Sequence, residues 1–365
     1  MRVDWLALTN FRSYPSLEWG PDPGINLMVG PNGAGKTNLL EAVGYLATLK
    51  SFRSVADEAM VADDSTSAVV RAGISTGERQ RLIEVEINRA GRRRAQVDKS
   101  GLKRTADLLG VVRVIAFLPE DLDVVKRGPA YRRDLLDDIA VQLWPGTHLD
   151  QSEFDRALRQ RNAFLRSGDR DEATLGVWDS RLAQSGGRVI ARRAAALDTL
   201  GPRLESVYAA IAGIEDRASL GYSSSWAGGG QLEPGSVADY ASQIAAALEK
   251  SRRPDFDRRV STVGPHRDEP SFHINGADTR SHGSQGEQRS MALAVKLAAH
   301  RAVAEMIGEP PVLILDDVFS ELDATRAKAL SDAVPEGAQT LITTARPEDV
   351  PLTGSVWRVG EGVTR

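Results

Sequence analysis

The sequence predicts an α/β fold, with a mixed sheet covered by helices and a helical arm inserted into the chain. Short segments rich in β-branched and aliphatic residues fill residues 1–126 and return after residue 256. Between them, residues 127–255 consist of long stretches of Ala, Leu, Arg, Glu and Gln. We therefore expect a head domain built from residues 1–126 and 256–365, with residues 127–255 forming the inserted arm, or lid.

The composition is that of an ordinary globular protein. The chain has 365 residues, of which 41% are hydrophobic, so it can bury a sizeable core. It contains no run of about 18 or more apolar residues, and it begins with a strand-like MRVDWLALTNF rather than a basic segment leading into an apolar one. We therefore expect a cytoplasmic protein with no membrane partner.

The cysteine count excludes thiol chemistry, and the net charge limits how the chain could bind nucleic acid. The absence of cysteine excludes disulfides, thiolate metal ligands and cysteine catalysis, and it suits a reducing compartment. The formal net charge of -4 means that any nucleic-acid binding must use a local basic patch.

The N-terminal segments predict strands around one helix. The strand-like segments are VDWLALTNF, INLMVG, AVVRAGIS, RLIEVEIN and VRVIAFL. Between the second and third of these, residues 37–49 carry apolar side chains at three- and four-residue spacing, which predicts a helix with one buried face. A strand, a glycine loop and a helix therefore follow one another.

The inserted region predicts antiparallel helices. Apolar residues follow the steps of a packing seam at Leu175, Trp178, Leu182, Val189, Leu197, Leu200, Leu204, Val207 and Ile211. Core packing between helices explains this seam without a binding partner. Gly201 and Pro202 are expected to kink or break the second helix, because proline lacks the backbone donor. Residues 223–235 have the composition of a flexible loop.

After residue 256 the head is expected to resume. The segments are a turn-rich VGPHRDE, a strand-like SFHIN, a helix over residues 288–306, and the apolar strands VLIL and TLITT.

A glycine-rich loop carries the first chemical signal. It matches the pattern G-x-x-x-x-G-K-[ST] and consists of Gly30, Pro31, Asn32, Gly33, Ala34, Gly35, Lys36 and Thr37. The glycines let backbone amides surround phosphate oxygens, Lys36 brings positive charge to the β- and γ-phosphates, and Thr37 can ligate Mg²⁺. With a strand before it and a helix after it, the loop predicts ATP binding.

An apolar strand that ends in two acids carries the second signal. Residues 312–315 are followed by Asp316 and Asp317. Asp316 is expected to hold Mg²⁺ through its water shell, and Asp317 to orient or deprotonate the attacking water. We therefore treat Asp316, Asp317 and Lys36 as the candidate catalytic residues.

Two further segments point to one branch of the phosphate-loop proteins. Ser284 and Gly286 precede or begin a helix, where a hydroxyl and backbone amides can hold an anion. A simple helix cap is the alternative for Ser284. A short acidic loop ending at Asp323 follows the acidic strand. The order of these motifs is that of an ABC-type ATPase.

Taken together, the motifs resemble the RecF family of bacterial DNA-repair proteins. The segments that carry the resemblance are LTNFRSY, GPNGAGKTNLLEA, FLPEDL, GPHRD, SQGEQRS and LDDVFSELD, which span nearly the whole chain. The resemblance implies a head related to those of Rad50 and SMC proteins with a short helical arm. It also implies an ATP-driven homodimer in which two heads share each nucleotide.

The resemblance also assigns residue roles. Arg12 is expected near the nucleotide, and Glu120 or Asp121 in a loop that senses the γ-phosphate. Ser284 and Gly286 are expected to reach the γ-phosphate bound to the second copy. Gln288 and Asp323 complete the expected nucleotide-binding set.

Two positions depart from the pattern of transporter ATPases. Thr343 and Thr344 stand where transporters usually carry a histidine, and Asp317 stands where they use glutamate. The shorter acid predicts slow hydrolysis, which suits a switch. The resemblance further implies DNA binding in recombinational repair, with RecR and RecO as partners in loading RecA at single-strand gaps.

Basic residues suggest where DNA could bind. The densest stretch comprises Arg89, Arg92, Arg93, Arg94, Lys99, Lys103 and Arg104, with Asp98 opposing it. A solvated hairpin is the alternative. A second group, Arg252, Arg253, Arg258 and Arg259, is diluted by Asp255 and Asp257. His266 and Arg267 are expected to stabilise a turn, and no histidine cluster has metal-ligand spacing.

Two other functions remain open at this point. One is the ATPase subunit of a membrane transporter, which the long insertion and the unusual SQGEQ disfavour. The other is a scaffold in which nucleotide locks a dimer without being hydrolysed. Intact Lys36, Asp316 and Asp317 argue against the scaffold.

Overall fold

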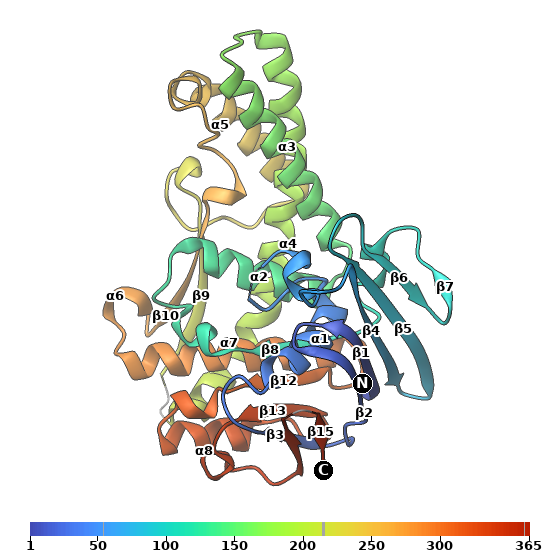
Figure 1. The fold of residues 1–365 in the computed structure, drawn as a ribbon. Coiled ribbons are helices and arrows are strands. Elements are labelled where there is room, and N and C mark those ends of the chain that lie inside the picture. Colours follow the sequence, from blue (N-terminus) through green and yellow to red (C-terminus); the bar gives the residue numbers. More distant parts are fainter. Residues whose placement is uncertain (54, 214–215, 361) are drawn as a thin grey trace. The chain divides into compact units, whose positions relative to one another are not determined.

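The computed structural model describes residues 1–53, 55–213, 216–360 and 362–365 (Figure 1). The chain forms two compact units. The sheet unit comprises Met1–Asp123, Ser206–Glu215 and Arg289–Arg365, and the helical unit comprises Val124–Glu205 and Asp216–Gln288.

A mostly parallel sheet forms the centre of the sheet unit. Its strand order is β15-β14-β3-β13-β12-β8. The strands are β3 (Ile25–Val29), β8 (Val114–Phe117), β12 (Val312–Asp316), β13 (Thr340–Thr344), β14 (Ser355–Val359) and β15 (Val363–Thr364). Among the described strand pairs of this sheet, β14 and β15 are antiparallel and the others are parallel. β12 and β13 are buried along their whole length, as is typical of parallel strands covered on both faces.

A second sheet of the same unit is antiparallel, with the order β2-β1-β4-β5-β6-β7. Its strands are β1 (Arg2–Phe11), β2 (Tyr14–Trp19), β4 (Ser67–Thr76), β5 (Arg79–Asn88), β6 (Arg94–Val97) and β7 (Ser100–Gly101). The strands predicted from the N-terminal segments therefore form, but they divide between two sheets.

Helix α1 (Lys36–Thr48) contacts strands of both sheets, namely β1, β8, β12 and β13. The sequence predicted a helix over residues 37–49 with one buried face. The helix is confirmed, but the single buried face is wrong, because every residue from Leu39 to Ala47 is buried. Contact with two sheets leaves no side of this helix for solvent.

The remaining helices of the sheet unit are short or shared. The part of α7 (Gln285–Ile307) from Arg289 onward belongs to this unit, as does α8 (Ala324–Ala333). Single 3₁₀ turns lie at Asp57–Met60, Thr105–Leu108, Pro119–Asp123, Phe319–Glu321 and Pro347–Asp349.

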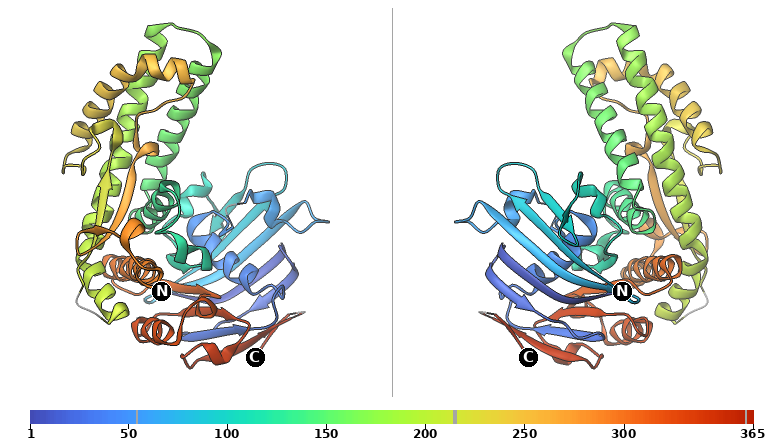
Figure 2. Two further views of the ribbon diagram at one scale, coloured as in Figure 1. Left: turned by 90° about the vertical axis from the view of Figure 1, so that its left-hand side faces the viewer. Right: turned by 90° about the vertical axis from the view of Figure 1, so that its right-hand side faces the viewer.

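The helical unit contains α2 (Pro129–Leu143), α3 (Thr147–Ser167), most of α4 (Glu172–Ala212), α5 (Val237–Arg258) and α6 (Thr279–His282). In both side views, α3 and α4 run alongside one another, with α5 against them (Figure 2). A buried cluster joins these three helices through Phe154, Leu182, Ile190, Tyr240 and Ile244. Single 3₁₀ turns lie at Ser225–Ala227 and Pro265–Arg267.

The predicted packing seam is one continuous helix rather than two. Its apolar residues are mostly buried on α4, and the break expected at Pro202 does not occur. Leu200 and Leu204 are buried on either side of the proline. Packing of this apolar face outweighs the loss of one backbone hydrogen bond.

A small antiparallel sheet in the helical unit was not predicted in full. Its order is β11-β10-β9, with β9 (Ala218–Ser223), β10 (Glu269–Ile274) and β11 (Ala277–Asp278). The sequence predicted β10 but missed β9. Because β9 and β10 pair, residues 256–288 belong to the helical unit, whereas the sequence predicted that the head resumes at residue 256.

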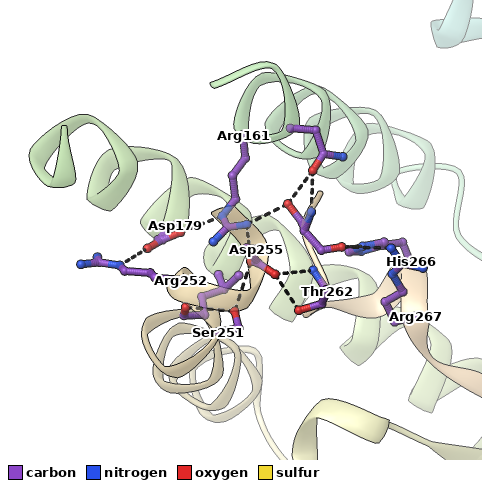
Figure 3. Close-up of polar contacts among 11 residues, drawn as sticks. Arg161, Asp179, Ser251, Arg252, Asp255, Thr262, His266 and Arg267 are labelled. Atoms are coloured by element: carbon purple, nitrogen blue, oxygen red, sulfur yellow. Dashed lines mark hydrogen bonds and ion pairs between the residues drawn. The ribbon is translucent and has the colours of Figure 1, made fainter. Parts of the chain in front are cut away.

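A buried guanidinium joins three segments of the helical unit (Figure 3). Arg161 of α3 donates to Asp179 of α4 and to Asp255 of α5, each at 2.7 Å, and to the Ser261 hydroxyl at 2.9 Å. Arg161 and Asp255 are fully buried. Asp255 also accepts from Thr262, through its hydroxyl at 2.6 Å and its amide at 3.0 Å. The acid that was expected to dilute a basic surface is thus a buried partner.

The two residues expected to stabilise a turn do so in this network. The ring Nε2 of His266 contacts the Ser261 carbonyl at 3.1 Å, and Arg267 donates to the same oxygen at 3.2 Å.

Among the described residues, no helix combines the length and apolar character that crossing a membrane requires.

We predict that Arg161→Met lowers the free energy of unfolding by about 3–5 kcal/mol, because it leaves Asp255 charged, buried and short of a cation. The midpoint of urea denaturation, followed by far-ultraviolet circular dichroism, measures this. Arg188→Met is the control, since Arg188 pairs with Asp150 at a partly exposed site and should cost less than about 1 kcal/mol. Equal losses in the two variants would contradict the role given to Arg161.

A buried histidine predicts acid sensitivity. Burial lowers the pKa of His300 from 6.5 to about 4, and its Nε2 contacts the Pro311 carbonyl at 3.0 Å. In the unfolded chain His300 binds a proton below about pH 6.5, whereas in the folded chain it binds one only near pH 4. This group therefore contributes full stability above pH 6.5 and loses it progressively toward pH 4, by roughly 3 kcal/mol.

We predict that His300→Gln makes the free energy of unfolding less dependent on pH between about 6.5 and 4. Urea denaturation at a series of pH values measures the slope. The exposed His282→Gln serves as control and should keep the wild-type slope. An unchanged slope in His300→Gln would show that the buried ring does not set the acid response.

Candidate nucleotide-binding site

The glycine loop lies between β3 and α1, as the motif requires. Gly33 and Gly35 have φ angles of 84° and 98°, a left-handed region that side-chain-bearing residues rarely adopt. A Cβ on Gly35 would lie 2.8 Å from the Tyr14 hydroxyl oxygen and 3.0 Å from Ser13 Oγ. The Tyr14 hydroxyl also donates to the Gly35 carbonyl at 3.1 Å. The first strand pair therefore supports the loop from one side.

Lys36 is buried inside the curve of this loop. Its ammonium donates to the carbonyls of Gly30 at 2.6 Å and Pro31 at 2.9 Å. Burial lowers the pKa of Lys36, while the charges of Asp317 and Asp316 raise it. The ammonium thus faces both acids and lies where a phosphate chain held by the loop would meet it.

Asp316 ends β12 and is brought to the loop by the order of the strands. Its Oδ1 accepts from the Thr37 hydroxyl at 3.0 Å and from the Thr343 hydroxyl at 2.6 Å. Burial raises the pKa of Asp316, the two hydroxyl hydrogen bonds lower it, and the charges of Asp317 and Glu120 raise it further. A cation at this point would stabilise the ionised carboxylate.

The donors at this point fit Mg²⁺ bound together with a triphosphate. Mg²⁺ prefers oxygen ligands and is usually held through one or two carboxylates plus substrate phosphates and waters. Thr37 and Asp316 supply one hydroxyl and one carboxylate in contact. Within the described part of the chain, no group of three or more His, Cys, Asp or Glu residues could hold a metal by itself. The site is therefore suited to a metal that arrives with its nucleotide.

Asp317 is held in an unusual backbone conformation. Its φ is 50°, and its amide donates to the Thr343 hydroxyl at 2.9 Å and to the Thr343 carbonyl at 3.2 Å. Aspartate tolerates this left-handed region better than most residues. One carboxylate oxygen of Asp317, Oδ1, is buried without a hydrogen-bond donor among the described residues.

Arg12 is engaged within the protein. Its guanidinium makes a bidentate pair with Glu41 of α1, at 2.8 Å for each bond, and donates to the Ala59 carbonyl at 2.7 Å. Glu41 is fully buried. In this structure Arg12 therefore links α1 to the antiparallel sheet, and its contact with nucleotide stays a prediction.

Glu120 and Asp121 differ in their surroundings. Asp121 pairs with Lys296 at 3.0 Å and accepts from the Leu118 amide at 2.8 Å, so it stabilises its own turn. Glu120 is exposed, and its charge acts on Asp316. Of the two, Glu120 is the residue whose charge raises the pKa of Asp316.

Ser284 caps α7. Its hydroxyl accepts from the Glu287 amide at 3.2 Å, while its own amide donates to the Glu287 carboxylate at 2.6 Å. This reciprocal pair is a capping box, so the simple cap considered for Ser284 is present. Gly286 lies in the first turn, partly exposed. Gln288 is buried, and its side-chain amide donates to the carbonyls of Thr279 and Gly283 at 3.2 and 3.0 Å.

Asp323 also caps a helix. Its carboxylate accepts from the Arg326 amide at 3.0 Å and pairs with the Arg326 guanidinium. The side chain is exposed. Its expected role toward nucleotide, like those of Ser284, Gly286 and Gln288, remains a prediction.

The structure divides the basic stretch into structural and exposed residues. Arg89 donates to the carbonyls of Val61 and Ala62, and Arg93 pairs with Asp57 and donates to the Tyr45 hydroxyl. Arg104 pairs with Asp107 at 2.9 Å. The other basic side chains of this stretch, Arg92, Arg94, Lys99 and Lys103, are exposed, and Arg94 pairs with Glu86 at 3.7 Å.

The comparisons with known proteins agree with this geometry. The family described as the RecF/RecN/SMC N terminal domain matches residues 2–361. A "DNA replication and repair protein RecF" from Kineococcus radiotolerans is 42% identical, covering 96% of this chain and 94% of its own length. The chain belongs to the RecF family. A second protein with that name, from Streptomyces avermitilis, is 39% identical and covers 99% of each chain.

Solved structures match the family fold. One is described as the recombination mediator protein RecF-ATPrS in the RecFOR pathway, with a TM-score of 0.91, 30% identity and coverage of 99% and 97% of the two chains. A structure described as RecF-ATP in the same pathway has a TM-score of 0.87 and 31% identity, and the match covers 100% of this chain and 98% of that chain. An SMC head bound to the C-winged helix domain of ScpA has a TM-score of 0.57 at 15% identity, and the match covers 100% of this chain and 96% of that chain. The predicted family and its head fold are confirmed.

Sequence reasoning missed three residues that shape the site. Glu41 interrupts an otherwise apolar helix, which signals a buried ionic partner, and Arg12 is that partner. Tyr14 supports Gly35, and no local pattern marks this contact. Thr343 is marked in the sequence only as a position without the histidine that transporters usually carry. Its position in a strand that is buried throughout signals a required hydrogen bond.

We predict that Gly35→Ala weakens binding of a nucleoside triphosphate far more than Gly33→Ala. Both substitutions force a Cβ into a left-handed backbone, at about 1–2 kcal/mol. Only at position 35 does the Cβ also meet Tyr14 and Ser13, since nothing lies within 4 Å at position 33. Titration with a fluorescent triphosphate measures both affinities. Equal affinities would show that Tyr14 does not constrain the loop.

Proposed function

We propose that this protein binds ATP with Mg²⁺ and, in that state, binds DNA in recombinational repair. It would act with RecO and RecR to help load RecA at single-strand gaps. The observation that carries the proposal is the contact between Thr37 and Asp316 beside the glycine loop, in a chain of the RecF family. Relatives described with ATP and ATPrS in the RecFOR pathway support it.

Each residue of the site has a proposed part. Backbone amides of residues 30–37 bind the phosphates, and Lys36 neutralises charge on the β- and γ-phosphates. Thr37 and Asp316 hold Mg²⁺, which supplies charge neutralisation at the phosphates. Asp317 orients the attacking water through its carboxylate. The shorter side chain of aspartate favours slow hydrolysis suited to a switch.

The nucleotide also joins two copies in this proposal. Ser284, Gly286 and Gln288 of one copy would complete the site of the other, with Asp323 near the same interface. The exposed α7 start supports this, because backbone amides at a helix N-terminus favour an anion. In this proposal the sheet unit is the nucleotide-binding head, and the helical unit, which contains most of residues 127–255, is the arm.

DNA is proposed to contact the exposed basic residues of the hairpin. Arg92, Arg94 and Lys103 can neutralise phosphates without reading sequence. Arg93 and Arg104 have protein partners and would contribute less. We place the protein in the cytoplasm, which its lack of cysteine suits.

A nucleotide-locked scaffold is the second candidate. The observation that favours it is Asp317, which replaces the longer glutamate and leaves more distance to a bound phosphate. The transporter alternative is set aside, because the chain belongs to the RecF family over nearly its whole length.

We predict that ATP, but not ADP, produces a dimer that binds a gapped duplex at low salt. Light scattering and fluorescence anisotropy measure the two events on the same samples. Lys36→Met should abolish both, and Ser284→Arg should abolish dimerisation while nucleotide binding persists. Ser180→Arg, at an exposed position of α4, is the matched control and should behave as wild type.

Each outcome separates the candidates. A dimer that binds DNA but never releases phosphate would favour the scaffold over the switch. A protein that binds ATP without any ATP-dependent association with DNA would contradict the proposed function.

A further inference from the structure

Thr343 contacts both acids of the site, although the sequence marks it only as a position where transporters usually carry a histidine. It is the fourth residue of β13, which lies between β3 and β12. In register it stands beside Met28 on one side and Asp316 on the other. Its side chain is 1% exposed. A hydroxyl this deeply buried needs hydrogen-bond partners.

The chemistry of its two partners fixes the direction of both hydrogen bonds. The backbone N–H of Asp317 can only donate, so the Thr343 hydroxyl oxygen accepts that bond, at 2.9 Å. The single hydroxyl hydrogen is then donated to Asp316 Oδ1, at 2.6 Å. One hydroxyl therefore contacts both acids at once.

These contacts constrain the two carboxylates differently. Asp316 Oδ1 receives hydroxyl hydrogens from Thr37 and Thr343, which together fix the rotation of the carboxylate. At Asp317 the hydroxyl holds the backbone rather than the side chain, at a residue whose φ is 50°. The carboxylate of Asp317 then points from a fixed backbone, with its Oδ1 unpartnered among the described residues.

We propose that Thr343 is a positioning residue for ATP hydrolysis, because its hydroxyl sets the orientation of Asp316 and Asp317 relative to one another. This inference rests on the proposed function of the same site. Thr344 does not share the role, since its hydroxyl donates to the Arg346 carbonyl at 2.9 Å instead. Thr343 touches neither nucleotide nor water in this assignment, and it acts through the two acids.

The test compares Thr343→Val and Thr343→Ser in the full-length protein. Valine keeps the shape and removes the hydroxyl, so kcat should fall about ten- to hundredfold, as expected for a misplaced catalytic group. The Kd for ATP should change less than about twofold, because Thr343 makes no contact with the loop in the described contacts. The Mg²⁺ concentration for half-maximal rate should rise. Serine restores the hydroxyl and should recover kcat to within a few-fold of wild type.

Thr340→Val is the matched control. Thr340 is fully buried in the same strand, but its hydroxyl donates to the Ala338 carbonyl, at 3.4 Å, rather than to either acid. Thr340→Val removes a hydroxyl from the same strand but leaves the hydrogen bonds of Asp316 and Asp317 intact. Should Thr343→Val fail to fold, Thr343→Ala compared with Thr343→Ser isolates the hydroxyl, since the two differ by one oxygen.

The possible results distinguish the positioning role of Thr343 from the proposed ATP-binding function on which it rests. A kcat for Thr343→Val equal to that of Thr340→Val would overturn the positioning role while leaving the ATPase intact. Loss of ATP binding in parallel with kcat would also overturn it, because a general packing defect predicts that pattern. A wild-type protein that binds no ATP would instead contradict the proposed function itself.

Discussion

The hydrogen bond between the Thr37 hydroxyl and the Asp316 carboxylate joins residues 279 positions apart in the chain. It forms because β3 and β12 flank β13 in one parallel sheet, so that all three strands end at the same edge. The glycine loop leaves β3 at that edge, and the two acids leave β12 there. The chemistry assigned to this protein depends on that strand order, since neither half of the chain contains the site alone.

Buried ion pairs of arginine join different elements in each unit. In the sheet unit, Arg12 and Glu41 tie the helix that follows the glycine loop to the antiparallel sheet. In the helical unit, Arg161 ties α3, α4 and α5 together through two carboxylates. Both use arginine, whose rigid fork can bind several acceptors at once. Removal of one partner from such a pair leaves a charge without compensation, so each pair restricts how its segments can pack.

The sequence predicted much of this protein because several signals agree. The glycine loop, the acidic strand and the helical composition of the insertion each rest on local patterns that tertiary contacts then satisfied. Strand β9 was missed because its partner lies some 50 residues away, and the sequence ASLGYS has no strong strand pattern. Of the kink or break predicted at Pro202, the break does not occur, because residues packed on both sides of the proline keep the helix continuous.

The roles of individual charged residues were harder to predict than the motifs. Arg93 and Arg89 lie in a basic stretch, yet backbone carbonyls and Asp57 bind them. Asp255 looked like a surface acid and is fully buried. Composition counts charges but does not reveal which ones face each other across 94 residues, as Arg161 and Asp255 do. Thr343 shows the same limit, because its two partners are fixed only by the register of β12 and β13.

The most direct test of the central claim is a crystal structure with Mn²⁺ and a non-hydrolysable ATP analogue, in which anomalous scattering locates the metal. The account predicts one strong anomalous peak between the triphosphate, the Thr37 hydroxyl and the Asp316 side chain, directly or through one water. A peak remote from both side chains, with nucleotide bound in the glycine loop, would contradict it.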